Sequence, residues 1–211
     1  MKVILSNKTA ELVEKKSRFI ANIFYVQNEK EANDRLNDIR KKYYDAKHNC
    51  FAYVIGVNGE IVKLSDDGEP SGTAGHPMLD ILKGSELTNV IAIVTRYFGG
   101  VLLGTGGLVR AYSDSLKMAL DSTDFSEIKD GIEVNFKLNY DEYGLWERQK
   151  GNILEISKDF SENIDLKYLI EENLFENVEK NLINITKGRV LIDKKNPKKY
   201  YICYNNEVRY V

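Results

Sequence analysis

The sequence predicts an α+β protein with two domains, at residues 1–125 and 131–211. Two observations lead to this prediction. Eleven of the 15 glycines lie between Gly56 and Gly107, so special backbone geometry is concentrated in the first part of the chain. After a polar joint at 121–131, the strand and helix patterns follow the order βαββαβ, which is that of the ferredoxin-like split unit.

The first domain opens with a strand and a helix. The segment 16–26 is rich in β-branched and aromatic residues, which is typical of a strand. In 28–44 the apolar residues recur at helical spacing, and Asn28 with Glu31 resembles a capping box. A strand followed by a helix is therefore expected here.

A hairpin and a short helix follow. The strands expected at 50–57 and 60–65 flank Asn58–Gly59, the strongest short hairpin signal. The segment 77–87 predicts a helix that opens at Pro77, because proline is favoured at the first helical position. The continuous apolar run 90–98 predicts a strand covered on both faces.

The first domain closes with a glycine loop at 99–107 and a helix at 108–122. In the second domain we expect strand 132–139, helix 141–150, strands 152–159 and 164–171, helix 174–186, and one or two closing strands within 189–204.

Composition excludes several classes of protein. Hydrophobic residues make up 43% of the 211 and the net charge is −2, which fits a folded soluble protein rather than a disordered or strongly basic one. Any nucleic-acid binding would need a local basic patch. The chain start shows no secretory signal, and the two distant cysteines read as reduced thiols, so we expect a cytoplasmic protein.

The loop at 65–77 and the following strand hold most of the polar candidates. Three carboxylates, Asp66, Asp67 and Glu69, could hold Mg²⁺ or Mn²⁺, or one of them could act as a general base. The alternative is that they serve turn chemistry. Arg96, with Tyr97 beside it, could pair with this acidic loop or bind phosphate by its planar fork.

The second loop, 99–107, could cradle an anion. Glycines permit close approach to the backbone, a helix N-terminus offers free N–H groups, and Thr105 could cap that helix. Tight packing of the turn is the alternative. A basic patch near the C-terminus could bind single-stranded nucleic acid or could be a solvated hairpin tip; it comprises Lys187, Arg189, Lys194, Lys195, Lys198 and Lys199.

Four segments closely resemble the YigZ/IMPACT family: "KSRFIA" (16–21), "AKHNCFAYVIG" (46–56), "DDGEPSGTAGHPML" (66–79) and "VTRYFGGVLLGTGGLVRAY" (94–112). The resemblance implies a two-layer βα first domain like domain IV of elongation factor G, followed by a ferredoxin-like domain like its domain V. It also implies a link to translation, because eukaryotic relatives regulate translation through a protein partner.

The resemblance assigns no catalytic residues, but its motif positions mark one candidate site. Together with Thr105, the predicted ligand- or anion-binding residues are Arg18, Thr73, Arg96, Tyr97, Gly99, Gly100, Gly104, Gly106, Gly107 and Arg110. Three functions stay open at this point: a translation-linked protein that binds RNA, the ribosome or a phosphate-bearing ligand; a metal-assisted phosphoester or nucleotide hydrolase or transferase; and a protein-binding adaptor.

Overall fold

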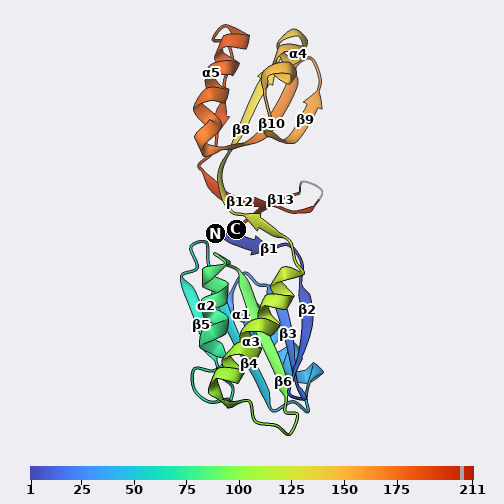
Figure 1. Ribbon diagram of the computed structural model, residues 1–211. Helices are drawn as coiled ribbons and strands as arrows, with labels where there is room; N and C mark the ends of the chain where they lie inside the picture. Colours follow the sequence, from blue (N-terminus) through green and yellow to red (C-terminus); the bar gives the residue numbers. More distant parts are fainter. Residues whose placement is uncertain (205–206) are drawn as a thin grey trace. The chain divides into compact units, whose positions relative to one another are not determined.

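The computed structural model describes residues 1–204 and 207–211, which form two compact units (Figure 1). The first unit comprises Met1–Ile128 with Tyr201–Arg209 and Val211, and the second comprises Lys129–Tyr200 with Tyr210. Each unit combines helices and strands, so the predicted mixed α and β class with two domains is confirmed.

The first unit is built on a five-stranded sheet in which all neighbouring strands are antiparallel. Its strands, in spatial order, are β2 (Lys8–Glu14), β3 (Ser17–Tyr25), β6 (Val90–Tyr97), β4 (His48–Ile55) and β5 (Ile61–Ser65). The apolar run predicted as a doubly covered strand is the central strand β6, seven of whose eight residues are buried. The predicted hairpin joins β4 to β5.

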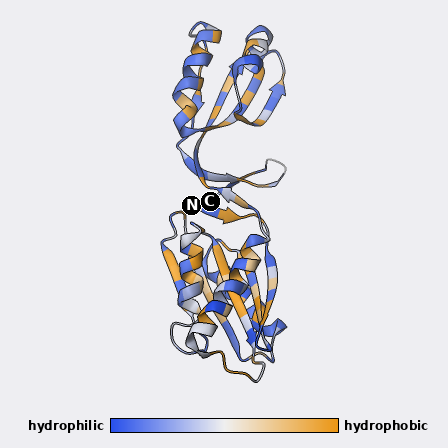
Figure 2. Ribbon diagram, in the orientation of Figure 1, coloured by the Kyte–Doolittle hydropathy of each residue, from blue (hydrophilic) through white to orange (hydrophobic). Residues whose placement is uncertain are grey.

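Helices cover both faces of this sheet. Helices α2 (Gly75–Gly84) and α3 (Gly104–Asp121) pack on one face, and α1 (Glu29–Lys42) packs on the other. Alternation along the strands feeds both cores, and Figure 2 shows the hydrophobic residues that these strands carry. The expected two-layer fold corresponds to the sheet with α2 and α3. Helix α1 adds a third layer on the other face of the sheet.

The second unit has the predicted ferredoxin-like order. Its elements are β8 (Lys129–Leu138), α4 (Tyr140–Gln149), β9 (Leu154–Phe160), β10 (Ile164–Glu171), the 3₁₀ turn η1 (Glu172–Leu174), α5 (Phe175–Thr186), β11 (Asp193–Lys194) and β12 (Lys198–Ile202). Strand β10 lies between β8 and β9, and the closing strands β11 and β12 pair with β8. A core around Phe136 and Trp146 joins the sheet to its helices.

Several short strands escape the sequence patterns. Strand β1 (Lys2–Ile4) pairs with β7 (Phe125–Glu127) inside the segment predicted to be a polar joint, and β13 (Val208–Tyr210) extends the second sheet. Two helix starts were also wrong: α2 begins at Gly75 instead of Pro77, and α3 begins at Gly104 instead of residue 108.

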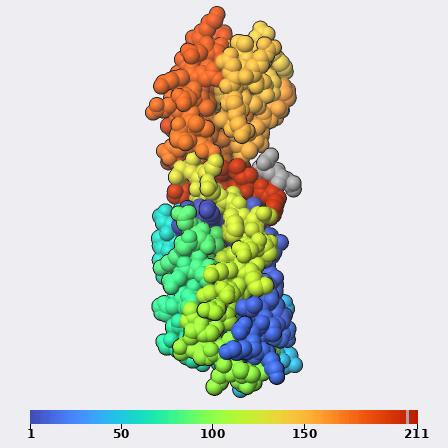
Figure 3. Space-filling view, in the orientation of Figure 1, coloured from blue at the N-terminus to red at the C-terminus, as the bar shows by residue number. Residues whose placement is uncertain are grey.

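The end of the chain returns to the first unit. The predicted second domain ran from 131 to 211, whereas the second compact unit comprises Lys129–Tyr200 and Tyr210. The ring of Tyr201 lies 6.0 Å from that of Tyr25, and the backbone N–H of Ile202 donates to Ser126 Oγ at 3.2 Å. Tyr204 donates its hydroxyl to Asp124 at 2.6 Å. In Figure 3 this red segment adjoins the dark blue start of the chain.

Candidate functional site

Strand register brings the motif loops to one end of the first sheet. Tyr97 at the end of β6 pairs with Arg18 at the start of β3, and Arg96 pairs with His48 at the start of β4. The turn before β3, the loop after β5 and the loop after β6 therefore lie at the same end of the strands. We call this end of the sheet the sheet end.

Asp66 is used to hold the start of helix α2. Its carboxylate accepts the backbone N–H groups of Gly72 at 2.8 Å, Ala74 at 3.0 Å and Gly75 at 2.8 Å. Burial alone would raise the pKa of Asp66, but these three hydrogen bonds outweigh it and lower the pKa below its ordinary value. The side chain satisfies N–H groups that a helix start leaves without partners.

Asp67 ties the acidic loop to β4 and α1. One carboxylate oxygen accepts the backbone N–H of Asn49 at 2.7 Å, and the other accepts Arg40 Nη2 at 3.2 Å. The Nδ1 of His48 lies 2.9 Å from the carbonyl oxygen of Asp67, so this nitrogen donates to it. His48 is therefore a structural residue, whereas His76 is exposed.

Glu69 and Arg96 form a buried ion pair, so Arg96 pairs with the acidic loop. Arg96 Nη1 donates to both carboxylate oxygens of Glu69, at 2.7 and 2.9 Å, and Tyr112 donates to the same carboxylate at 2.8 Å. The guanidinium lies 5.4 Å from the ring centre of Phe19 and 5.6 Å from that of Phe98. Its buried Nε has no hydrogen-bond partner among the described residues.

Burial also sets the protonation of the groups behind this pair. The Sγ of Cys50 lies 3.3 Å from the hydroxyl of Tyr112, and burial raises the pKa of Cys50 to about 12. Burial raises the pKa of Tyr112 as well. Both groups stay protonated at neutral pH, so neither is an activated nucleophile.

The predicted metal ligands turn to three different sets of partners. Asp66 faces backbone N–H groups, Asp67 faces Arg40 and Asn49, and Glu69 faces Arg96 and Tyr112. Within residues 1–204 and 207–211, no three His, Cys, Asp or Glu side chains are grouped as a metal site needs. The magnesium site stays an untested prediction that these contacts do not favour.

The glycines of the second loop, 99–107, differ in the structural requirement that each one meets. A Cβ on Gly99 would lie 2.0 Å from the carbonyl carbon of Lys16, so close packing requires glycine there. Gly100 and Gly104 have positive φ, at 84° and 70°. A Cβ on Gly106 would meet open space, and one on Gly107 would lie 3.0 Å from Leu103 Cβ.

Two threonines of the predicted site have local roles. Thr105 is not the cap of α3, because Leu103 occupies the N-cap position and no side chain caps the helix. Thr73 is buried and donates its hydroxyl to the carbonyl of Pro70 at 2.7 Å, within the acidic loop.

Arg18 and Tyr97 lie at the sheet end beside the motif loops, and Arg110 is exposed on α3. Arg18 forms a two-point ion pair with Glu11, at 2.7 and 3.1 Å, and lies over the ring of Tyr97. Tyr97 donates its hydroxyl to Asp45, and this bond raises the pKa of Tyr97 to about 12. Both side chains are held by protein partners.

The sheet end also carries an exposed surface that the sequence patterns missed. Phe98, Val101 and Leu102 are 54%, 42% and 83% exposed, and Tyr44 is 85% exposed. The segments 15–16 and 41–47, which border this end, carry five exposed lysines without an ion-pair partner among the described residues: Lys15, Lys16, Lys41, Lys42 and Lys47. We call these nine residues the sheet-end surface.

Contacts between the loops connect this surface. Gly99 packs against the backbone of Lys16, and the ring of Tyr97 lies 6.5 Å from that of Tyr43 at the end of α1. A sequence signal for this surface was the concentration of lysine and tyrosine in 40–47. The helical spacing of 28–44 led us to interpret most of that segment as the end of a helix.

The basic residues predicted as a nucleic-acid patch in the second unit mostly have partners. Arg189 pairs with Glu142, Lys195 with Asp193 and Lys199 with Asp130. Lys194 lies over the ring of Phe175, and Lys198 lies over the ring of Tyr210. Lys187 follows the last residue of helix α5 and has a positive φ. Nucleic-acid binding here stays a prediction.

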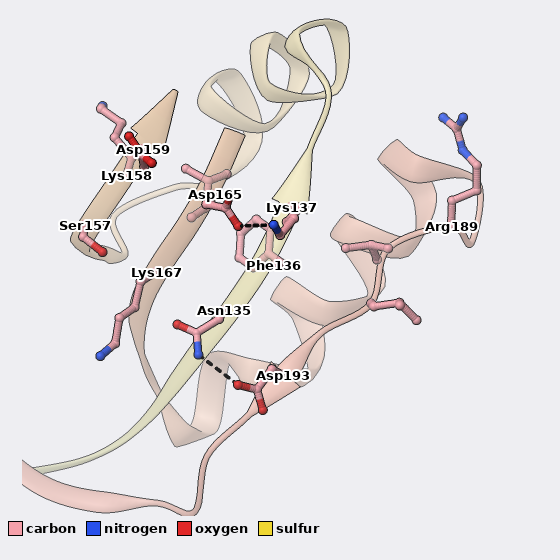
Figure 4. A pocket seen from close by; sticks show the side chains of 13 residues that line it. Asn135, Phe136, Lys137, Ser157, Lys158, Asp159, Asp165, Lys167, Arg189 and Asp193 are labelled. Carbon is pink, nitrogen blue, oxygen red and sulfur yellow. Dashed lines mark hydrogen bonds and ion pairs between the residues drawn. The ribbon is translucent and has the colours of Figure 1, made fainter. Parts of the chain in front are cut away.

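A hollow of about 620 Å³ lies in the second unit (Figure 4). It crosses the sheet over β8, β9 and β10, with Arg189 and Asp193 at its side. Lys137 pairs with Asp165 at 2.9 Å, and Asn135 donates to Asp193 at 3.1 Å. Four basic and three acidic residues line this hollow, so its lining has no strong excess of either charge. Neither this hollow nor four smaller ones in the described part of the chain are lined by the glycine loops.

The fold defines a class: a two-domain mixed α and β protein, in which a sheet covered by helices on both faces precedes a ferredoxin-like unit. No helix in the described part of the chain has the length and apolarity needed to cross a membrane.

Comparison with known proteins identifies the family. The Impact N-terminal domain matches residues 15–120. The IMPACT family member YvyE of Bacillus subtilis strain 168 is 40% identical over 181 residues, which cover 85% of this chain and 83% of the relative. An IMPACT family member of Haemophilus influenzae is 42% identical over 188 residues, or 84% of this chain and 88% of the relative. The chain belongs to the IMPACT family.

A solved structure is similar to most of the chain. The crystal structure of a hypothetical protein covers 90% of this chain and 95% of its own, with 30% identity and a TM-score of 0.60.

Proposed function

We propose that this protein is a translation-linked regulatory protein that binds RNA through the sheet-end surface. Membership of the IMPACT family supports a translation-regulatory role in general. The observation that carries the RNA assignment is that the segments at this end of the sheet carry five exposed lysines without ion-pair partners in the described chain, together with exposed Tyr44, Phe98 and Leu102.

The chemistry of this surface suits single-stranded RNA. Lysine ammonium groups contact phosphates, and exposed aromatic rings offer faces on which bases stack. The whole chain has a net charge of −2, so attraction to RNA must come from a local surface of this kind. Because no carboxylate pairs with these lysines among the described residues, their charge is available to a ligand.

The buried motif residues supply rigidity beneath this surface. The Glu69–Arg96 pair lies directly under Phe98, and the bonds of Asp66 and Asp67 fix the adjoining loop. A surface held in this way loses little conformational entropy on binding. This role also accounts for three carboxylates that the hydrolase alternative would need for its metal.

The test is RNA binding as a function of salt. If five lysines contact phosphates, the logarithm of the affinity should fall with a slope of about 3.5 against the logarithm of salt, or roughly a hundredfold between 50 and 200 mM. A variant with Lys→Gln at the five lysine positions of the sheet-end surface should lose most of the affinity and most of the slope.

The matched control changes Lys187, Lys194, Lys195, Lys198 and Lys199 to glutamine in the second unit, and under this proposal it should bind like the wild type. Ribosomal particles provide a second ligand for the same comparison. Equal binding by the wild type and the five-lysine variant would refute the proposal, as would affinity confined to a protein partner.

A further inference from the structure

Another hollow, which lies in the first unit, has two arginines in its lining, whereas the positive charge of the sheet-end surface comes from lysines. It measures about 290 Å³ and is lined by residues 4–7, Tyr25, Arg35, Tyr201, Cys203 and Arg209. Tyr25 ends β3, whereas the sheet-end residue Arg18 begins it, so the hollow lies at the opposite end of that strand. The returning C-terminal segment forms one part of its wall.

Arg35 and Arg209 line this hollow, and no carboxylate residue lines it among the residues that the structure describes. Arg35 comes from α1 and Arg209 from the last strand, so two distant parts of the chain supply the positive charge. Asn7 accepts the backbone N–H of Tyr25 at 3.1 Å through Oδ1, and its amide N–H donors have no partner in the described chain. The polar lining is therefore rich in donors.

Each of the two arginines already has one exposed carboxylate partner. Asp38 lies 4.0 Å from Arg35, and Glu207 accepts from Nε and Nη2 of Arg209 at 3.3 Å each, with all four side chains at least 46% exposed. Both pairs are exposed to solvent, which screens them, so an incoming anion can compete with the two carboxylates for the arginines. Arginine forks match the oxygen geometry of phosphate, and two of them can share one group.

We infer that this hollow binds the phosphate group of a small phosphorylated metabolite, held between Arg35 and Arg209. The volume suits a ligand of that size, below the range of most drug-sized pockets. The tilted rings of Tyr25 and Tyr201, 6.0 Å apart, give the organic part of the ligand an aromatic wall. The inference does not depend on RNA binding at the sheet end.

Two readouts on the full chain test this site. Inorganic phosphate and ribose 5-phosphate, compared with chloride and acetate at equal ionic strength, should raise the melting temperature by binding the folded state. They should also slow the alkylation of Cys203, which lines the hollow, several-fold. Cys50 is fully buried away from the hollow and serves as the internal reference.

Variants locate the effect. Arg35→Gln and Arg209→Gln should each raise the half-saturating phosphate concentration tenfold or more, while RNA binding stays unchanged. Arg148→Gln is the matched control, because Arg148 is exposed on α4 without an ion pair among the described residues. Phosphate acting no better than chloride would overturn the inference, and so would equal protection of Cys203 in both arginine variants. An effect of acetate equal to that of phosphate would overturn the assignment of phosphate.

Discussion

Removing the carboxylate of Glu69 should strongly destabilise the first unit. The side chains of Glu69 and Arg96 are 3% and 7% exposed, and Arg96 Nη1 bonds to both carboxylate oxygens. In Glu69→Gln the guanidinium keeps its charge and stays buried, with Nε already lacking a partner among the described residues. Breaking a buried pair by removing one partner costs about 3–5 kcal/mol, so we expect a loss of that size.

The assay must report on the first unit alone. Amide hydrogen exchange of peptides from β6, Val90–Tyr97, measures opening of the strand that carries Arg96. The single tryptophan, Trp146, lies in the core of the second unit, so its fluorescence gives an internal control. Glu69→Gln should speed exchange in β6 while exchange in β10 stays unchanged.

A double variant separates the pair from its burial. In Glu69→Leu with Arg96→Met, no charge is left buried, so the double variant should be more stable than Glu69→Gln alone. A loss below about 1 kcal/mol in Glu69→Gln would refute the reasoning, because a buried arginine without its partner cannot be that well tolerated.

Two further predictions concern the loops around this pair. Gly99→Ala should destabilise the protein, because its Cβ would lie 2.0 Å from the backbone of Lys16. Gly106→Ala should stabilise α3 by up to about 1 kcal/mol, because its Cβ meets open space. A shift of both melting temperatures in the same direction would contradict this. The lowered pKa of Asp66 adds stability that is complete above its unfolded value of about 3.8 and is lost as the pH falls through the lower folded pKa. Urea unfolding between pH 2 and 6 should show less loss in Asp66→Asn than in the wild type.

Elements with a long, regular pattern could be predicted from the sequence. Strand β10 coincides with the predicted 164–171, and the helix at 174–186 differs from α5 by one residue. Strands β1 and β7 have three residues each, too few for alternation to be read. Helix α2 starts before Pro77 because Asp66, from outside the helix, bonds to its first N–H groups.

The candidate site was predicted by residue type, but its roles depend on packing. The sequence left Arg96 equally suited to an internal ion pair and to a ligand, and only the fold shows Glu69 beside it. Conversely, Lys16 and Leu102 are unremarkable in the sequence. They become candidates because β-strand register and the glycine at 99 bring their loops together.

The two kinds of residue at the sheet-end surface should contribute to binding in ways that can be told apart. Leu102 is 83% exposed and uncharged, so Leu102→Ser removes apolar contact but releases no counterions. We expect it to weaken RNA binding at every salt concentration by a similar factor and to leave the slope unchanged. Lys16→Gln should instead reduce the slope by about 0.7, the value for one phosphate contact on a single strand.

These two variants test whether the apolar loop and the lysines act on one ligand. If Leu102→Ser leaves RNA affinity unchanged while Lys16→Gln weakens it, the loop does not contact RNA, and the proposed surface reduces to its charges. If neither variant has an effect, the RNA lies elsewhere. Parallel losses with different slopes are expected only when the exposed loop and the lysines beside it contact the same strand.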